Sequence, residues 1–166
     1  IPAPALTFGC TSVAALDDAT DGHGLLLGRN FDYHGTGYWD RHRLVSRCEP
    51  EEGIPFLSAT TAGVISGGIT GLNAAGVGYA VHQHFVREAD IDGIPVCLAG
   101  DEIMHRARNA DEAVDILDSH PPVSGYTHII ADGSRGEVLL YEAAPGRRAI
   151  HRASQGTVAY TNAYID

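Results

Sequence analysis

Short stretches rich in apolar residues, bounded by polar turns, occur through the first 65 residues of the chain, and this pattern is typical of β-strands. The stretches cover residues 10–16, 25–33, 43–47 and 55–65. Polar or acidic turns separate them at 17–24 and 49–53. We therefore predict strands over these ranges, with the first two joined as a hairpin.

The clearest hairpin signal lies in residues 69–81. Here Asn73-Ala74-Ala75-Gly76 separates two apolar stretches. Asn and Gly both adopt positive φ readily, as a tight turn between strands requires. We predict a turn at these four residues.

The apolar spacing becomes helical at residues 95–108. Val96, Ala99, Ile103 and Ala107 recur at intervals of three or four, which places them on one face of a helix. Proline is well suited to the first turn of a helix, so Pro95 fits the start of this one.

A second, shorter helix is predicted over residues 112–117. Asn109 or Asp111 can cap its start, and Pro121 and Pro122 stop it. Short apolar stretches then return, and we predict strands at 126–131, 137–142, 148–152 and 157–161.

The order of these elements predicts an α+β fold, with helices packed on largely antiparallel sheets. The connections between strands are too short for crossover helices. The length of 166 residues suits a single domain. Apolar residues at 44% and charged residues at 19% are ordinary for a globular protein.

The formal net charge of −10 argues against nucleic acid or an anionic membrane as a partner, because both need clustered Lys and Arg. No apolar stretch approaches the roughly 18 residues that span a bilayer. Residues 1–5 lack the pattern of a signal peptide. The compartment stays open between the cytoplasm, slightly favoured, and secretion.

Three widely spaced cysteines form neither a disulfide framework nor a CxxC pair. For Cys48 and Cys97 we predict small buried apolar side chains. Cys10 differs in context, because Gly9-Cys10-Thr11-Ser12 opens the first predicted strand after a stretch with two prolines.

Four fragments follow one another along the chain and together carry a resemblance. They are Gly-Cys-Thr-Ser at 9–12, Gly-Arg-Asn-Phe-Asp-Tyr at 28–33, Gly-Leu-Asn-Ala-Ala-Gly-Val at 71–77 and Thr-Asn at 161–162. In this order they resemble the cysteine N-terminal-nucleophile (Ntn) hydrolases, and most closely the acyl-coenzyme A:6-aminopenicillanic acid acyltransferase-like branch. The bile salt hydrolase and penicillin V acylase branch is more distantly similar.

The resemblance implies a four-layer αββα fold and self-cleavage of the Gly9–Cys10 bond. Residues 1–9 would then be a leader and 10–166 the mature domain. Members of the branch are longer than this chain, so we expect only the N-terminal portion of the full fold here. A second chain is one source of the remainder.

Cleavage would turn the nitrogen of Cys10 into a free α-amine. A thiol attacks as the thiolate, and an adjacent amine can take its proton. An ordinary α-amine has a pKa of about 7.7–8.0, which lets it act as base and then as acid near neutral pH. While the leader remains attached, this nitrogen is an amide and has no basicity.

Arg29 and Asp32 match the Arg-x-x-Asp pattern of the family. The resemblance implies that Arg29 is a fixed cation near the Cys10 sulfur, where it favours the thiolate. It implies that Asp32 orients the new amine or the substrate. The alternative for both residues is an ordinary surface ion pair.

Asn162 matches a family asparagine near the oxyanion site, where one amide donor supplies roughly 3–4 kcal/mol; a strand-end turn former is the alternative. Gln83 falls where the bile salt hydrolase branch has an oxyanion asparagine, but its side chain is one methylene longer. Asn73 is a third amide candidate for oxyanion or substrate binding, and a turn role fits it better.

Two other classes of function compete with this hypothesis. His82 and His84 point to one face if they lie on a strand, and with His34, His42 or a nearby Asp they could form the zinc site of a hydrolase. The signal is weak because no third ligand has diagnostic spacing, and we expect no metal. A non-catalytic, truncated binding module is the third class.

The function we predict is acyl transfer at a carbon–nitrogen bond of a small-molecule amide, without a cofactor. Cys10 would form a thioester acyl-enzyme. Water, an amine or the thiol of coenzyme A would then receive the acyl group.

Overall fold

A computed structural model describes residues 9–32, 37, 39, 41–64 and 67–165 of the chain. Its strands are β1 (Gly9–Leu16), β2 (Leu26–Asp32), β3 (Arg43–Cys48), β4 (Phe56–Thr61), β5 (Thr70–Asn73), β6 (Val77–His84), β7 (Gly125–Asp132), β8 (Glu137–Ala144), β9 (Arg147–Ala153) and β10 (Gly156–Tyr160). Its helices are the 3-10 turn η1 (Asp17–Thr20), α1 (Val96–Arg106) and α2 (Ala110–Ser119). Residues 1–8 of the predicted leader lie outside the described part, as does His34.

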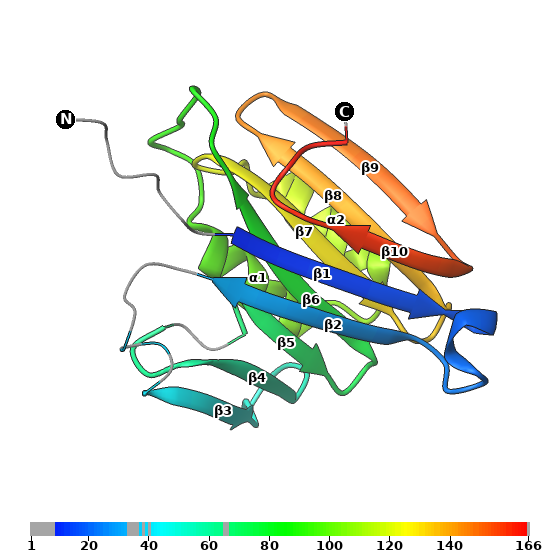
Figure 1. The fold of residues 1–166 in the computed structure, drawn as a ribbon. Coiled ribbons are helices and arrows are strands. Elements are labelled where there is room, and N and C mark those ends of the chain that lie inside the picture. The colour runs from blue at the N-terminus through cyan, green and yellow to red at the C-terminus, as the bar shows by residue number, and fades with distance from the viewer. Residues whose placement is uncertain (1–8, 33–36, 38, 40, 65–66, 166) are drawn as a thin grey trace.

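Two antiparallel sheets lie face to face (Figure 1). The smaller sheet has the order β10-β1-β2, and the larger has the order β3-β4-β5-β6-β7-β8-β9. All pairings between these strands are antiparallel. Both helices cover the outer face of the larger sheet (Figure 1).

Each face of the larger sheet has its own apolar core, because successive side chains of a strand point to opposite faces. On β7, Ile130 packs toward the helices, where Tyr79 and Ile103 are also fully buried. The neighbouring Ile129 packs instead between the sheets, against Leu16 and Leu140. The strands β6, β7 and β8 are therefore buried on both faces.

The predicted hairpin and helices are confirmed, with small shifts of boundary. Gly76 has φ +87° and its N–H donates to the carbonyl of Asn73 at 3.0 Å, which closes the turn. Pro95 precedes α1. Asn109 caps α2, since its Oδ1 accepts from the N–H of Glu112 at 2.9 Å, and α2 is longer than predicted at both ends.

The α+β class is therefore confirmed. Helix, sheet and sheet account for three layers, and among the residues that the structure describes no helix covers the outer face of β10-β1-β2. The described helices are also too short or too polar to cross a membrane.

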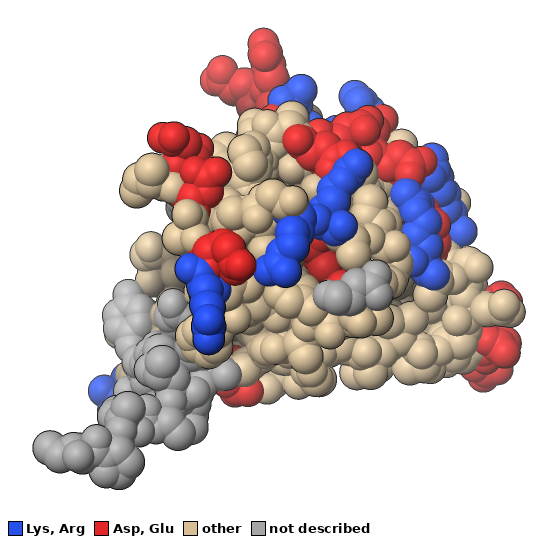
Figure 2. Space-filling view, turned by 90° about the horizontal axis from the view of Figure 1, so that it is seen from above, with Lys and Arg blue, Asp and Glu red and all other residues tan. Residues whose placement is uncertain are grey.

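Acidic and basic side chains stand beside one another on the surface seen in Figure 2. Arg152 pairs with Asp111 at 2.5 Å and with Glu137 at 2.8 Å, and Arg135 also reaches Asp111 at 2.5 Å. The acidic excess is thus interspersed with arginines, and this face carries no separate basic patch.

Candidate active site

Cys10 lies near the start of β1 on the side that faces the larger sheet. Its register partner on β2 is Phe31, and its exposed fraction is only 7%. The alternation of β1 buries Cys10, Ser12 and Ala14 in turn. A strand thus holds the thiol between the two sheets, where a nucleophile has little freedom to move.

Arg29 reaches the Cys10 sulfur from β2. Its Nη2 donates to Sγ at 3.5 Å and to the carbonyl oxygen of Val81 at 2.8 Å, and its Nη1 donates to Oγ1 of Thr70 at 2.5 Å. Its guanidinium carbon also lies 4.6 Å from the centre of the Phe31 ring. These contacts fix the direction of the cation toward the sulfur.

Burial lowers the pKa of Arg29, while the nearby Cys10 opposes this shift. An arginine nevertheless stays charged in proteins. Its Nε is buried and has no hydrogen-bond partner within the described part of the chain. An unsatisfied donor of this kind costs free energy, and such groups are rare outside functional sites.

Asn162 contacts the nitrogen of Cys10 from just beyond β10. Its Oδ1 accepts a hydrogen bond from the Cys10 N–H at 2.5 Å, and its Nδ2 donates to the carbonyl oxygen of Gln83 at 2.7 Å. The oxyanion role predicted for Asn162 would use Nδ2, which keeps one N–H besides the one given to Gln83. The contact between Asn162 and the nitrogen of Cys10 was not predicted.

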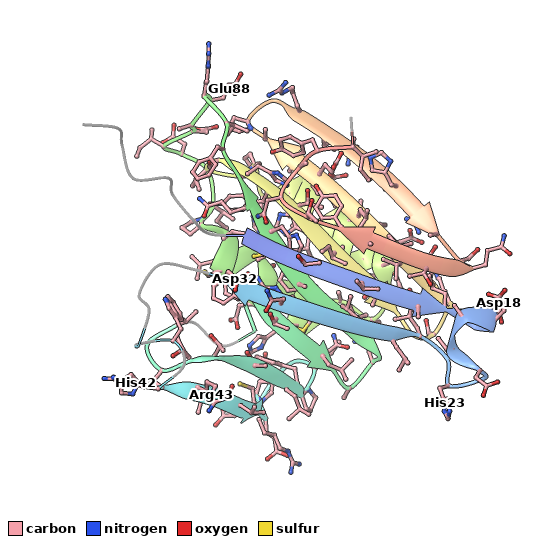
Figure 3. The ribbon with its side chains drawn as sticks, viewed as in Figure 1. Asp18, His23, Asp32, His42, Arg43 and Glu88 are labelled. Atoms are coloured by element: carbon pink, nitrogen blue, oxygen red, sulfur yellow. The ribbon has the colours of Figure 1, made fainter. Side chains whose placement is uncertain are left out.

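Asp32 lies at the end of β2, opposite Gly9 in the register (Figure 3). Its Oδ2 accepts from Nδ2 of Asn30 at 2.7 Å, and the residue is exposed. The structure thus brings Asp32 opposite Gly9, and its side chain bonds to a neighbour on its own strand. Within the described part of the chain, the alternative of an ion pair between Arg29 and Asp32 is not among the contacts of Arg29.

A cavity of about 270 Å³ opens beside Cys10 and Arg29. This volume is near the lower limit for small-molecule sites. Gln83 lies in its wall, which is consistent with the predicted oxyanion role of its amide. Most of the lining is apolar or aromatic, including Phe31, Trp39, Ile69, Val81, Val96 and Tyr126.

Two larger cavities, of about 370 and 510 Å³, also have Arg29 in their walls. The larger one extends from Phe31 and Trp39 toward Arg43 on β3. Arg29 thus borders the small cavity and the open surface between β2 and β3. A substrate could place one part on each side of it.

Asn73 belongs to a different part of the molecule. Its Nδ2 donates to the carbonyls of Met104 and Ala107 at 3.2 and 2.7 Å, and its Oδ1 accepts from the N–H groups of Ala75 and Val77 at 3.1 and 3.0 Å. Its amide joins the hairpin turn to the end of α1. The structure therefore favours the turn role over the substrate-binding role.

His82 and His84 both point toward the smaller sheet, as the strand spacing predicts. Nε2 of His82 lies 2.9 Å from Oγ of Ser12, and Nε2 of His84 lies 2.8 Å from Oγ1 of Thr127. Burial lowers the pKa of His82 to about 4 and lowers that of His84 as well. The described residues include no group of three or more His, Cys, Asp or Glu side chains placed to hold a metal. The zinc hypothesis therefore gains no support from the geometry.

Cys48 and Cys97 are half-buried, so the prediction of buried side chains was wrong for both. Cys97 lies in the first turn of α1 and lines the cavity beside Cys10, and burial raises the pKa of its thiol. Its placement follows from the packing of α1 on the sheet. Two further site residues were missed, Thr70 and Trp39, because neither belongs to a recognisable motif.

Comparison with known proteins matches residues 19–166 to the family of the acyl-coenzyme A:6-aminopenicillanic acid acyl-transferase. The chain belongs to this family. A comparison with curated proteins found no match. Membership in the acyltransferase family indicates acyl transfer or amide hydrolysis on a small-molecule substrate. The matched range includes Arg29, Gln83 and Asn162 but begins after Cys10, so the assignment of the nucleophile depends on the geometry around that thiol.

Proposed function

We propose that the protein is a self-processing cysteine acyltransferase or amide hydrolase of the Ntn type, with Cys10 as its nucleophile. The observation that carries the proposal is that two residues far apart in the chain both contact Cys10. Arg29 donates to the sulfur of Cys10, and Asn162 accepts from its nitrogen. A thiol and its own amine are the two groups that this mechanism needs.

Self-cleavage would begin with attack of the Cys10 sulfur on the carbonyl carbon of Gly9. The carbon–nitrogen bond breaks, a thioester forms, and the Cys10 nitrogen takes a proton to become an amine. Water then hydrolyses the thioester and releases a carboxylate on Gly9. The pairing of Gly9 with Asp32 supports a role for this carboxylate, in which Asp32 holds the water or the new amine.

Turnover would repeat the same chemistry on a substrate amide. The α-amine of Cys10 accepts the thiol proton as sulfur attacks the carbonyl carbon, and it returns the proton to the leaving nitrogen as the carbon–nitrogen bond breaks. The acyl group remains on sulfur as a thioester. Water, an amine or a thiol then removes it and regenerates the free thiol.

The residues around Cys10 have separable roles in this scheme. Arg29 favours the thiolate, because an opposite charge close to a titrating group stabilises its charged form. The side chains of Gln83 and Asn162 supply amide donors for the oxyanion. The apolar cavity of about 270 Å³ receives the acyl group, while the leaving group lies toward β3. The fold would be part of the four-layer αββα arrangement.

The proposal is tested by incubating the purified chain and measuring its intact mass and N-terminal sequence. We expect a new chain beginning at Cys10. The processed protein is then treated with 4-nitrophenyl acetate, and an acetyl adduct should be found by peptide mass on Cys10. The proposal would be overturned if neither the new N-terminus nor the acetyl adduct on Cys10 formed.

A further inference from the structure

The chain beyond β10 folds back across the ends of β6 and β8, and contacts hold it along its length. The carbonyl oxygen of Thr161 lies 3.3 Å from Nδ1 of His82. Asn162 follows, with its bonds to Cys10 and Gln83. This segment, residues 161–165, is called the return segment below.

Tyr164 anchors the return segment two residues after Asn162. Its hydroxyl donates to the carbonyl oxygen of Ala143 on β8 at 2.9 Å. Its ring stacks on the imidazole of His84, with centroids 4.0 Å apart and an interplanar angle of 22°. One side chain therefore joins the segment to both strands.

Glu142 closes the return segment into a loop. Its Oε1 accepts from the hydroxyl of Tyr160, the last residue of β10, at 3.0 Å, and from the N–H of Ile165 at 2.7 Å. Its Oε2 lies 3.2 Å from Nε2 of His151, and only 2% of the residue is exposed. A buried carboxylate is costly unless such partners satisfy it. The residue before the return segment and the last residue of the segment thus bond to the same oxygen atom.

We propose that Tyr164 and Glu142 are positioning residues for the nucleophile, acting through Asn162. The inference rests on the proposed function of Cys10. Neither residue contacts the thiol. They hold the return segment so that the Asn162 amide spans the gap between the nitrogen of Cys10 and the carbonyl of Gln83.

The physical reason is the direction of the lone pair on the Cys10 amine. When one N–H of the amine points at Oδ1 of Asn162, the rotation of the amine is restricted and its lone pair can be held toward Sγ. The acceptor also stabilises the ammonium form, because a hydrogen bond to the charged form favours that form. A misplacement of about 1 Å can cost about 100-fold in rate. A five-residue segment without anchors could not hold such a position.

The test uses the processed protein and the variants Tyr164→Ala and Tyr164→Phe. The rate of acetylation of Cys10 by 4-nitrophenyl acetate is measured from pH 5 to 9 (roughly the range in which an α-amine titrates). In Tyr164→Ala we expect the rate to fall by about 10-fold. We also expect the acidic limb of the pH–rate profile to move to lower pH by about half a unit. The ammonium form of the Cys10 amine loses its hydrogen-bond acceptor in this variant, which lowers the pKa of the amine. Tyr164→Phe keeps the stacked ring and should retain most of the rate.

Two further variants set the scale of the effect. Asn162→Ala removes the acceptor itself and should move the limb in the same direction by a larger amount. Thr157→Ala, on the exposed face of β10, is the matched control and should behave as the unmodified protein. Circular dichroism establishes for each variant that it is folded at the assay temperature. Glu142→Gln keeps an acceptor oxygen and is measured in case Tyr164→Ala does not fold.

The outcomes separate the two proposals. If the unmodified protein forms no Cys10 adduct, the proposed function fails and this inference fails with it. If the adduct forms and both Tyr164→Ala and Glu142→Gln match Thr157→Ala in rate and limb, the function stands and the positioning role is wrong. A loss of rate with an unmoved limb also overturns it, because general loosening of the fold would produce that result.

Discussion

Asn73 and Asn162 lie toward opposite ends of β6 and use the same side chain for different purposes. At the hairpin end, the four hydrogen bonds of the Asn73 amide go to main-chain groups of the turn and of the end of α1. At the Cys10 end, Asn162 divides its amide between the main chain of Gln83 and the nitrogen of Cys10, the proposed nucleophile. Both side chains have hydrogen-bond partners, so the presence of partners does not distinguish a structural asparagine from one with a catalytic role. The distinction is whether a partner atom belongs to a reactive group.

The largest expected effect comes from removing the sulfur. Cys10→Ala should abolish both leader cleavage and acyl transfer, because one atom carries out both steps. Intact mass and product formation measure the two steps separately. Cys48→Ala, a substitution of a half-buried thiol on β3, is the control and should retain both. Cleavage that persists in Cys10→Ala would remove the self-processing mechanism.

The two asparagines can be compared directly as alanine variants. Asn73→Ala leaves buried main-chain groups without partners and should lower the free energy of unfolding by about 3 kcal/mol. The activity of the folded fraction should be unchanged. Asn162→Ala should lower the rate of Cys10 acylation by about 100-fold with a smaller loss of stability. Urea denaturation and acylation rates measure the two effects, and equal losses of rate in both variants would contradict the distinction.

The pH dependence of stability should also differ between the ends of β6, because its buried histidines, His82 and His84, lie at the Cys10 end. Burial lowers the pKa of His82 to about 4 in the folded protein, against about 6.5 when it is unfolded. Between these values the unfolded state binds more protons, so stability falls as the pH drops from about 6.5 to about 4. The expected loss is about 2–3 kcal/mol. Urea denaturation at several pH values should show a smaller slope in His82→Gln; an unchanged slope would assign the dependence to other groups.

The smallest of these effects is expected at Arg29. Arg29→Ala should slow iodoacetamide alkylation of Cys10 at neutral pH by about 10-fold, since the nearby cation favours the thiolate. Arg29→Lys keeps the charge but loses the forked guanidinium that reaches Thr70 and Val81. Its alkylation rate should lie between those of the unmodified protein and Arg29→Ala. Peptide mass identifies the alkylated thiol. Equal alkylation rates in all three proteins would leave Arg29 with a structural role only.

Much of the architecture could be predicted because it depends on local chemistry. Short apolar stretches between polar turns predicted the strands, the helical spacing predicted α1, and Asn73 with Gly76 predicted the hairpin turn. Of the site, the family resemblance implied that Arg29 is a cation near Cys10, and β1 and β2 are adjacent in the chain and pair directly. A register between neighbouring strands is nearly a local property.

The remaining contacts of the site could not be predicted from local sequence. The contact between Asn162 and Cys10 joins residues 152 positions apart, and Thr70 reaches Arg29 across the gap between two sheets. Local sequence also predicted Cys97 as a core residue, whereas the packing of α1 on the sheet places it in the cavity wall.

By itself, the sequence determined the order and type of the elements, the tight turns and the presence of a thiol at the start of a strand, because these depend on each residue and its near neighbours. Only the tertiary structure decided that Asn162 approaches the nitrogen of Cys10, that Asp32 bonds to Asn30, and that Glu142 and Tyr164 hold the return segment. Those contacts depend on how two sheets pack and how the last residues fold back over them. Packing of that kind is the sum of many weak long-range contacts, and no local pattern of residues in the sequence predicts it.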